Sequence, residues 1–294
     1  MSASDLLFTG ERFLPDCERE IWYEHFHRYT MAVKFAKGKR VLDAACGEGY
    51  GSHLLSKTAS SVVGVDLSEK AIQHANKHYQ QSNLSFETSD VLNMNFSDDS
   101  FDLIVSFETL EHIVEHDDLL YEFKRVLKPE GVLLISTPDK KEYSDKTGFN
   151  NEYHLKELYQ HEFDDLINKK FKHSRWYGQK LMFTSSIWTM SKAENQPLES
   201  VQFDCMDNDK NIINQPLFNP IYFIVAASDV NLDSKMSKDL YCFTEQNEQI
   251  YGHYNAVIRA HIQAEKECEK LTNQQQIWRK HPIIGRCIKW FAKE

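Results

Sequence analysis

Residues 41–55, VLDAACGEGYGSHLL, join a short apolar run to a turn that contains three glycines. The run leads into Asp43, and Gly47, Gly49 and Gly51 follow within a few residues. A strand, a glycine-rich turn and a helix in this order commonly bring a nucleotide-like ligand onto backbone N–H groups. The segment therefore predicts a strand that leads into a ligand-binding loop and then into a helix.

The sequence around this segment alternates between short apolar runs and longer amphipathic ones. The predicted strands are RVLDAA (40–45), SVVGVD (61–66), LSFETSD (84–90), FDLIVSF (101–107) and GVLLIST (131–137), and the predicted helices are GSHLLSK (51–57), EKAIQHANKHYQQ (69–81) and DDLLYEFKRVL (117–127). This rhythm predicts an α/β fold with a mostly parallel sheet and helices on both faces. Two later runs, 171–179 and 219–228, are expected to pair antiparallel on either side of an insertion at 181–219.

Composition limits the classes of function. The chain has 294 residues, enough for one α/β core and an appendage, and a formal net charge of −10. This charge argues against a general nucleic-acid binder, because phosphate contacts need a basic face. The sequence therefore predicts no nucleic-acid partner.

The cysteines and the N-terminus indicate a compartment. The six cysteines show neither Cys-x-x-Cys pairs nor His/Cys spacing typical of zinc, so we expect reduced thiols and no metal site. The first residues lack the basic-then-apolar layout of a signal peptide, and no apolar run approaches the ~20 residues needed to cross a bilayer. We expect a cytoplasmic protein.

Acidic residues follow three of the predicted strands. Glu48 lies inside the glycine loop, where a carboxylate would repel a pyrophosphate but suit a positively charged ligand. Asp66 ends the second strand, where a carboxylate can accept both hydroxyls of a ribose. Asp90, in Ser89-Asp90-Val91, follows the third and can reach an adenine amino group. These positions predict a nucleoside ligand that carries positive charge.

The motifs VLDAACGEG, GVD, SDV and FDLIVSFETLEHI, in this order, resemble those of class I S-adenosylmethionine-dependent methyltransferases. The resemblance covers residues 38–140 well and extends plausibly to Ser228. It implies a Rossmann-like, doubly wound sheet of seven strands, the last of them, within 219–228, antiparallel. A Rossmann-like fold that binds NAD, or that has lost its ligand, is the alternative.

The same resemblance implies positions for S-adenosylmethionine. Asp43 and Gly47 to Gly49 would lie by its methionine portion, Asp66 would hold the ribose, Asp90 and Val91 would contact the adenine, and Phe107 would pack against the cofactor. Ala45 and Leu67, which flank these motifs, complete the predicted cofactor site, together with Arg28 and Tyr29 of the N-terminal segment.

Two histidines are the candidate catalytic residues. Methyl transfer from a sulfonium needs alignment of the acceptor, and a base is needed only when the acceptor is a neutral hydroxyl. His112 follows the fourth strand on the ligand side, and His154 lies in a segment that often forms a substrate lid in this family. Each can instead be an ordinary histidine that packs or caps near a helix. Glu108 and Glu111 are candidate substrate residues, and can also orient neighbours or cap the following helix.

His25, Arg28 and Tyr29 occur at helical spacing i, i+3 and i+4, so they share one face of a predicted helix. That face can close over the cofactor, with Arg28 and Tyr29 near its carboxylate, or reach an anionic acceptor. Alternatively the helix packs on the edge of the sheet, with Arg28 paired to an acid such as Glu24.

The arrangement FTGERFLP, EHFHRY and CGEGYGS is similar to that of methyltransferases associated with bacterial surface-polysaccharide synthesis, including O-antigen enzymes. It implies O-methylation of a sugar, or of a glycan-end phosphate. Two alternatives stay open: a methyltransferase for a small lipophilic or aromatic metabolite, and a catalytically silent cofactor-binding scaffold.

The last third of the chain suggests partners. Apolar or small residues in 250–271 recur at alternating spacings of four and three, which is typical of a packed helix or a short coiled coil and allows self-association. Residues 279–294 are basic and aromatic, which fits docking to an anionic membrane surface at its inner face or to a glycosyltransferase, or an intramolecular contact. The predicted domains are an N-terminal helical cap (1–37), a methyltransferase domain (38–229) and a helical C-terminal extension (230–294).

Overall fold

The computed structural model describes residues 20–182, 184, 205–206, 212–213, 218–232, 241–243 and 249–280. The chain divides into two units, residues 1–242 and 243–294. Most of the predicted insertion at 181–219, residues 1–19 of the predicted cap, and nearly all of the predicted docking segment at 279–294 lie outside the described residues. The predicted domain boundaries therefore stay predictions.

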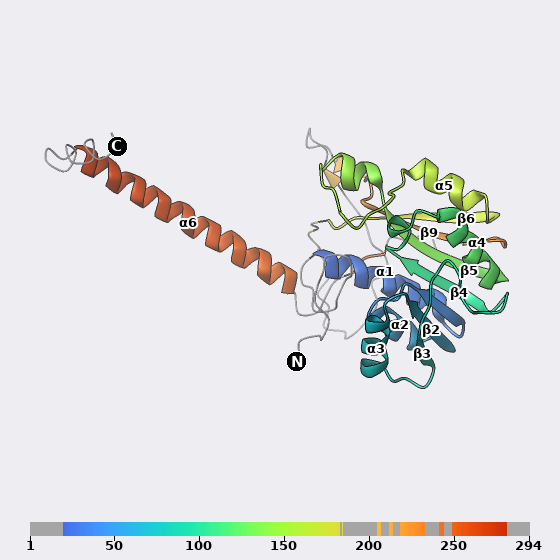
Figure 1. The fold of residues 1–294 in the computed structure, drawn as a ribbon. Helices are drawn as coiled ribbons and strands as arrows, with labels where there is room; N and C mark the ends of the chain where they lie inside the picture. Colours follow the sequence, from blue (N-terminus) through green and yellow to red (C-terminus); the bar gives the residue numbers. More distant parts are fainter. Residues whose placement is uncertain are drawn as a thin grey trace, which may run out of the picture. The chain divides into compact units, whose positions relative to one another are not determined.

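The first unit holds a seven-stranded sheet and its helices (Figure 1). Its elements are α1 (Glu20–Ala36), β1 (Arg40–Ala44), α2 (Tyr50–Ser56), β2 (Ser61–Asp66), α3 (Glu69–His78), β3 (Leu84–Thr88), β4 (Phe101–Phe107), η1 (Leu110–His112), α4 (His116–Val126), β5 (Leu127–Pro138), η2 (Lys141–Asp145), α5 (Gln160–Asn168), β6 (His173–Gln179), β7 (Cys205–Met206), β8 (Ile212–Ile213) and β9 (Tyr222–Ser228). The described part of the second unit is the helix α6 (Gln249–Lys280).

The strand order of the sheet is β3-β2-β1-β4-β5-β9-β6. β1 to β5 pair in parallel, whereas β9 runs antiparallel to both β5 and β6. The predicted fold class is confirmed, including the antiparallel direction of the last strand. The order reverses direction between β1 and β4, and in doubly wound sheets ligands bind at the carboxyl ends of the strands beside such a reversal.

Successive residues of the central strands point to opposite faces of the sheet. Leu103 and Val105 of β4 belong to a core shared with α1 and α2, whereas Ile104 belongs to a core shared with α4 and α5. Because both faces are covered, the strands are apolar almost throughout, as their sequences predict. A third, smaller apolar cluster packs Ile72 and Ala75 of α3 against β3 and the end of β1.

The helix α1, the described part of the predicted cap, packs on the sheet beside α2. Tyr29, Ala32 and Ala36 are buried in the core that they share with β1 and β4. Gly51 makes this packing close, because a Cβ atom at that position would lie 2.0 Å from the Tyr29 ring. The helix α1 is thus an integral layer of the fold, which holds its side chains at the carboxyl ends of the strands.

The helix α6 spans the predicted seam of residues 250–271 and continues beyond it to Lys280. None of the described helices is both long and apolar enough to cross a membrane.

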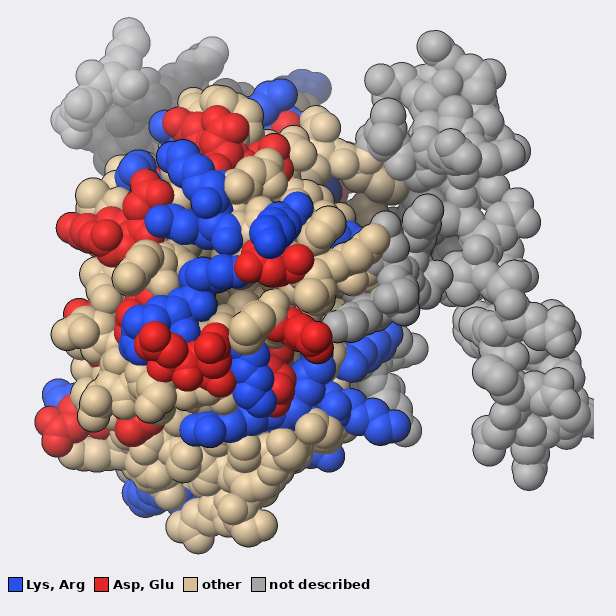
Figure 2. Space-filling view, turned by 90° about the vertical axis from the view of Figure 1, so that its right-hand side faces the viewer, with Lys and Arg blue, Asp and Glu red and all other residues tan. Residues whose placement is uncertain are grey.

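On the face shown in Figure 2, acidic and basic side chains are interspersed. Ion pairs of the described chain include Arg125 with Glu122 and Asp98, at 2.6 and 2.8 Å.

Candidate functional site

A cavity of about 490 Å³ lies at the carboxyl ends of β1, β2 and β4. Of the residues predicted for the site, those that line it are His25, Tyr29, Ala45, Gly47, Asp66, Leu67, Asp90, Val91, Phe107, Glu108, Glu111, His112 and His154. Arg28, Asp43 and Gly49 are absent from this lining. The structure thus brings together residues from the motifs after four different strands.

The backbone of the glycine loop bends sharply just after the carboxyl end of β1. Ala45 has a φ of 61°, Gly47 of 58° and Gly49 of 94°, all in the left-handed region that disfavours residues with a Cβ atom. Ala45 is thus a strained non-glycine residue in the cavity wall. Backbone strain of this kind often occurs at functional sites. The bend exposes backbone of the loop to the cavity and starts α2 at Tyr50.

Asp66 ties the loop to the end of β2. Its Oδ2 accepts a hydrogen bond from the Gly47 backbone N–H at 3.0 Å, and its Oδ1 accepts one from the Ser68 N–H at 2.8 Å. The side chain is largely buried but still lines the cavity. A fixed carboxylate at this strand end suits the two hydroxyls of a ribose.

Asp43 and Gly49 support the loop from behind. Asp43 is fully buried, and its two carboxylate oxygens accept hydrogen bonds from Tyr29 Oη at 3.0 Å and Ser52 Oγ at 2.6 Å. Burial raises the pKa of the Asp43 carboxyl to about 6, although both hydrogen bonds oppose the rise. A Cβ atom at Gly49 would lie 2.8 Å from Ala75 and Phe86. Both residues therefore shape the loop rather than line the cavity.

The structure corrects the interpretation of Glu48. Its carboxylate is buried and pairs with His74 Nε2 at 2.7 Å, and it accepts a hydrogen bond from Tyr79 Oη at 3.2 Å. These partners belong to α3 and the residue after it, and Glu48 does not line the cavity. The expectation that its charge faces a ligand was wrong, because the turn at Gly47 and Gly49 directs the side chain toward α3.

The three residues of α1 that were predicted for the site have different surroundings. His25 and Tyr29 line the cavity, with His25 Nδ1 3.2 Å from Tyr50 Oη. Burial, with the nearby charge of Arg28, lowers the pKa of His25 well below its usual value, so this imidazole is neutral at pH 7.

Arg28 instead points toward β6 and β9. Its Nη1 donates to Gln179 Oε1 at 2.7 Å and lies 3.8 Å from Glu108 Oε1, while the guanidinium lies over the Tyr222 ring. Glu108 and Glu24 both stabilise its charge. A cofactor contact by Arg28 stays a prediction, and in this structure the side chain supports Glu108 at the cavity wall.

Asp90 lines the cavity just after β3, and Phe107 lines it at the end of β4; β2 and β1 separate these two strands in the sheet. Asp90 Oδ1 accepts a hydrogen bond from the Leu92 N–H at 2.9 Å, which fixes the turn after β3. Phe107 is buried edge-on against Tyr29, with ring centroids 5.2 Å apart. The Asp90 carboxylate can accept a hydrogen bond from an amino group such as that of adenine, and the Phe107 ring supplies an aromatic surface elsewhere in the cavity.

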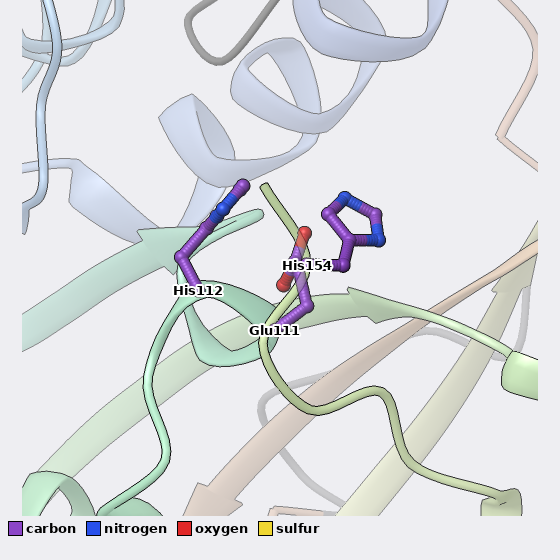
Figure 3. Close-up of side chains that lie close together, drawn as sticks. All are labelled: Glu111, His112 and His154. Carbon is purple, nitrogen blue, oxygen red and sulfur yellow. The ribbon is translucent and has the colours of Figure 1, made fainter. Parts of the chain in front are cut away.

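Glu111, His112 and His154 meet at one corner of the cavity (Figure 3), which we name the imidazole corner. Glu111 is 1% exposed, and its Oε2 accepts a hydrogen bond from Thr137 Oγ1 at 3.1 Å. Burial, with the nearby charge of Glu108, raises the pKa of Glu111 well above its usual value. The backbone carbonyl of Glu111 also accepts from the N–H groups of Leu155 and Lys156, at 2.8 and 3.1 Å.

The two imidazoles of this corner are oriented by oxygen acceptors. His112 Nδ1 lies 2.9 Å from the Tyr153 carbonyl oxygen, so this nitrogen carries the proton and donates it. His154 Nδ1 lies 2.5 Å from Glu157 Oε1, and Asn151 Nδ2 donates to His154 Nε2 at 3.0 Å. In the neutral rings, Nε2 is therefore the nitrogen that carries the lone pair.

Several residues that line the cavity were not predicted from the sequence. Tyr143 comes from η2, Asn151 from the loop before α5, and Tyr222 from the start of β9. No spacing within the sequence relates these segments to the glycine loop. Pairing of β9 with β5 and the backbone contacts of Leu155 and Lys156 with Glu111 bring them to the cavity.

The family comparison matches residues 35–211 to a methyltransferase domain. A probable S-adenosylmethionine-dependent methyltransferase of Mycolicibacterium smegmatis is 32% identical over 167 residues, which cover 56% of this chain and 64% of the relative. A ubiquinone biosynthesis O-methyltransferase of Coxiella burnetii is 37% identical over 103 residues, 34% of this chain and 44% of the relative. The chain thus spans less than two thirds of the length of these relatives.

Solved structures share the fold. A protein of Pyrococcus horikoshii, PH0226, superimposes with a TM-score of 0.53 and 19% identity, over 76% of this chain and 99% of that one. A Thermotoga maritima protein described as a possible histamine N-methyltransferase gives 0.51 and 15%, over 71% and 90%. With the family match over more than half of its residues, the chain belongs to the methyltransferase domain family.

Proposed function

We propose that the chain is an S-adenosylmethionine-dependent methyltransferase that methylates a hydroxyl group of a sugar. The observation that carries this proposal is the cavity itself. A carboxylate fixed at the end of β2 shares it with two oriented imidazoles and a buried carboxylate. One end thus suits a nucleoside, and the other suits an acceptor that must lose a proton.

The residues at the ends of β1 to β4 fit S-adenosylmethionine. We name Ala45, Gly47, Asp66, Asp90 and Phe107 the cofactor half of the cavity. Asp66 would hold the ribose, Asp90 and Val91 would contact the adenine, and the bent backbone at Gly47 would hold the methionine portion, while Phe107 would pack against the cofactor. When bound, the cofactor supplies a methyl group on a positively charged sulfur. The chain's contribution is to align the acceptor with that methyl group and to exclude water.

The acceptor half of the cavity is the imidazole corner together with Tyr143 and Asn151. A sugar hydroxyl is neutral, so its methylation is faster when a base removes the proton. The Tyr153 carbonyl fixes the tautomer of the neutral His112 ring, with the proton on Nδ1 and the lone pair on Nε2. We assign proton removal to His112 first and to His154 second, because His112 lies on η1, which follows the carboxyl end of β4.

The sugar acceptor rests on two kinds of support. The N-terminal motifs are similar to those of methyltransferases associated with surface polysaccharides, and the acceptor half is rich in hydrogen-bonding groups. O-antigen or another surface glycan, or its terminal phosphate, is the corresponding substrate class. We further propose a cytoplasmic location for the chain, at or near the inner face of the membrane.

A small lipophilic or aromatic metabolite is the second candidate acceptor. A relative of Coxiella burnetii is named a ubiquinone biosynthesis O-methyltransferase. Apolar side chains, including Ile113, Val114 and Leu155, also line this cavity, which favours a partly apolar substrate.

The test is mass spectrometry of the surface-glycan fraction of the source cells with and without this gene. Loss of one methyl-sized increment, restored by the intact chain but not by Asp66→Ala, supports the sugar acceptor. An unchanged glycan, with a lost methyl group on an extractable lipophilic compound, favours the second candidate. If the chain binds S-adenosylmethionine by calorimetry but neither fraction loses a methyl group, the catalytically silent cofactor-binding scaffold is favoured.

Two partner contacts complete the proposal. Self-association through residues 250–271 of α6 is tested by light scattering of the full chain and of a chain that ends before α6. Docking of residues 279–294 to a membrane or to a glycosyltransferase is tested by co-sedimentation with anionic liposomes before and after their deletion. Unchanged mass or unchanged partitioning would remove the respective proposal.

A further inference from the structure

The imidazole corner has the composition of a metal site. Glu111, His112 and His154 each offer one ligand atom, and these atoms all lie within 4.8 Å of one another. Figure 3 shows the Glu111 carboxylate between the two imidazole rings. Glu111 and His112 lie on η1, and His154 lies in the loop before α5, so the ligands come from two segments that pack together.

Both imidazoles have the hydrogen bonds that metal-binding histidines usually make. In such histidines, the ring nitrogen away from the metal donates to a carbonyl or carboxylate oxygen, which fixes the ring and raises its basicity. The Nδ1 of His112 has the Tyr153 carbonyl oxygen in this position, and the Nδ1 of His154 has the Glu157 carboxylate. Each pair leaves Nε2 as the nitrogen with the lone pair.

The donor set decides which class of ion fits. Two imidazole nitrogens and one carboxylate oxygen suit zinc and neighbouring transition metals, whereas magnesium and calcium prefer oxygen ligands. Zinc lies about 2.0–2.2 Å from such atoms, so the ligand atoms of a tetrahedral ion are about 3.4 Å apart. The present separations, up to 4.8 Å, require a contraction of the corner. The ion would also replace the Asn151 amide as the partner of His154 Nε2.

We propose that Glu111, His112 and His154 bind one divalent transition-metal ion of the zinc class, with a further coordination position open to the cavity. In that position the ion binds the oxygen of the acceptor and positions it. This part rests on the proposed O-methylation, whereas ion binding does not. With the ion bound, the lone pair of His112 Nε2 is used for coordination, so His112 then acts as a ligand and not as a base.

The test is zinc binding by the full chain without cofactor or acceptor. The chain is stripped with chelator and loaded with Zn²⁺ alone. Bound metal is then counted by mass spectrometry, and Co²⁺ is added in parallel to read its visible spectrum. We expect one ion per chain. His112→Ala and His154→Gln should each lower affinity by at least about 100-fold, and Glu157→Gln by about 10–100-fold. His173→Gln, at an exposed histidine of β6, is the matched control and should bind as the parent does.

The outcomes separate the two proposals. Equal zinc binding by the parent and by a His112→Ala/His154→Gln double variant, with both folded by circular dichroism, would overturn the metal site. So would an absence of binding in the parent. Methyl transfer that persists in chelator, with no bound ion, would keep the proposed function and reject the role of the ion in positioning the acceptor. Zinc binding without any methyl transfer would keep the metal site and reject the proposed function.

Discussion

The cofactor half and the acceptor half of the cavity differ in how their polar groups are held. In the cofactor half, Asp66 accepts hydrogen bonds from the N–H groups of Ser68 and of Gly47, 19 positions earlier in the loop after β1, and Asp90 accepts one from Leu92. In the acceptor half, Glu111 and His112 are tied to Tyr153, Leu155 and Lys156, about forty residues further along the chain. The first half is local in sequence, and the second depends on a docked loop. Substitutions should therefore separate cofactor binding from turnover.

The largest effect is expected in the cofactor half. Asp66→Ala removes the carboxylate assigned to the ribose, and two hydrogen bonds to a charged group contribute about 3–6 kcal/mol. S-adenosylmethionine affinity, measured by calorimetry, should fall by at least 100-fold. Asp165→Ala, at an exposed acid on α5, is the control. Unchanged affinity in a folded Asp66→Ala chain would contradict the assignment of this half.

The complementary change is His112→Ala in the acceptor half. Loss of a positioned base, or of a metal ligand, lowers the turnover number by about 10²–10⁴-fold. Cofactor affinity should change by less than about threefold. Turnover and cofactor binding are measured on the same preparation, with His173→Ala as the control. Near-normal turnover with intact cofactor binding would exclude His112 from the chemistry.

The next change concerns the support behind the cofactor loop. Burial raises the pKa of the Asp43 carboxyl to about 6, so between pH 4 and 6 the folded chain holds a proton that the unfolded chain releases. Stability therefore falls as pH rises through this window, by up to about 3 kcal/mol, and levels off above it. Asp43→Asn removes this contribution. Urea unfolding of both chains at several pH values gives the difference. Parallel curves would show that Asp43 titrates normally.

The smallest effect is expected where α1 meets α2. Gly51→Ala places a Cβ atom 2.0 Å from the Tyr29 ring and displaces it from the core. Overpacking of this kind costs about 1–3 kcal/mol of unfolding free energy. Gly252→Ala, in open space on α6, is the control and should be neutral or stabilising. Denaturant unfolding measures both. Equal stability of the two variants would mean that α1 packs less tightly than described.

The features that the sequence predicts best are those that depend on the order of neighbouring strands and loops along the chain. The alternation of short apolar runs predicts the strands and their parallel pairing, and the directions of β6 and β9 are confirmed. Ala45, Gly47, Asp66 and Asp90 share the cavity because parallel strands end at one edge. That physical rule converts spacing along the chain into proximity.

The misplaced or missed residues depend on how side chains turn and how distant loops dock. Glu48 was expected to face the ligand, but left-handed turns on either side direct it to His74. Arg28 shares a helical face with Tyr29 by spacing, yet it reaches Gln179 at the end of β6 and Glu108 just after β4. Asn151 enters the cavity only because its loop docks on Glu111. No local pattern encodes these contacts.

The most direct test of the account follows a deuterated methyl group from labelled S-adenosylmethionine into cell-envelope extract. The parent chain, Asp66→Ala and His112→Ala are compared by mass spectrometry of the products. The account predicts a trideuteromethyl ether on one sugar with the parent chain, loss of cofactor binding and product with Asp66→Ala, and loss of product alone with His112→Ala. A label on nitrogen or carbon, or equal product from His112→Ala, would contradict it.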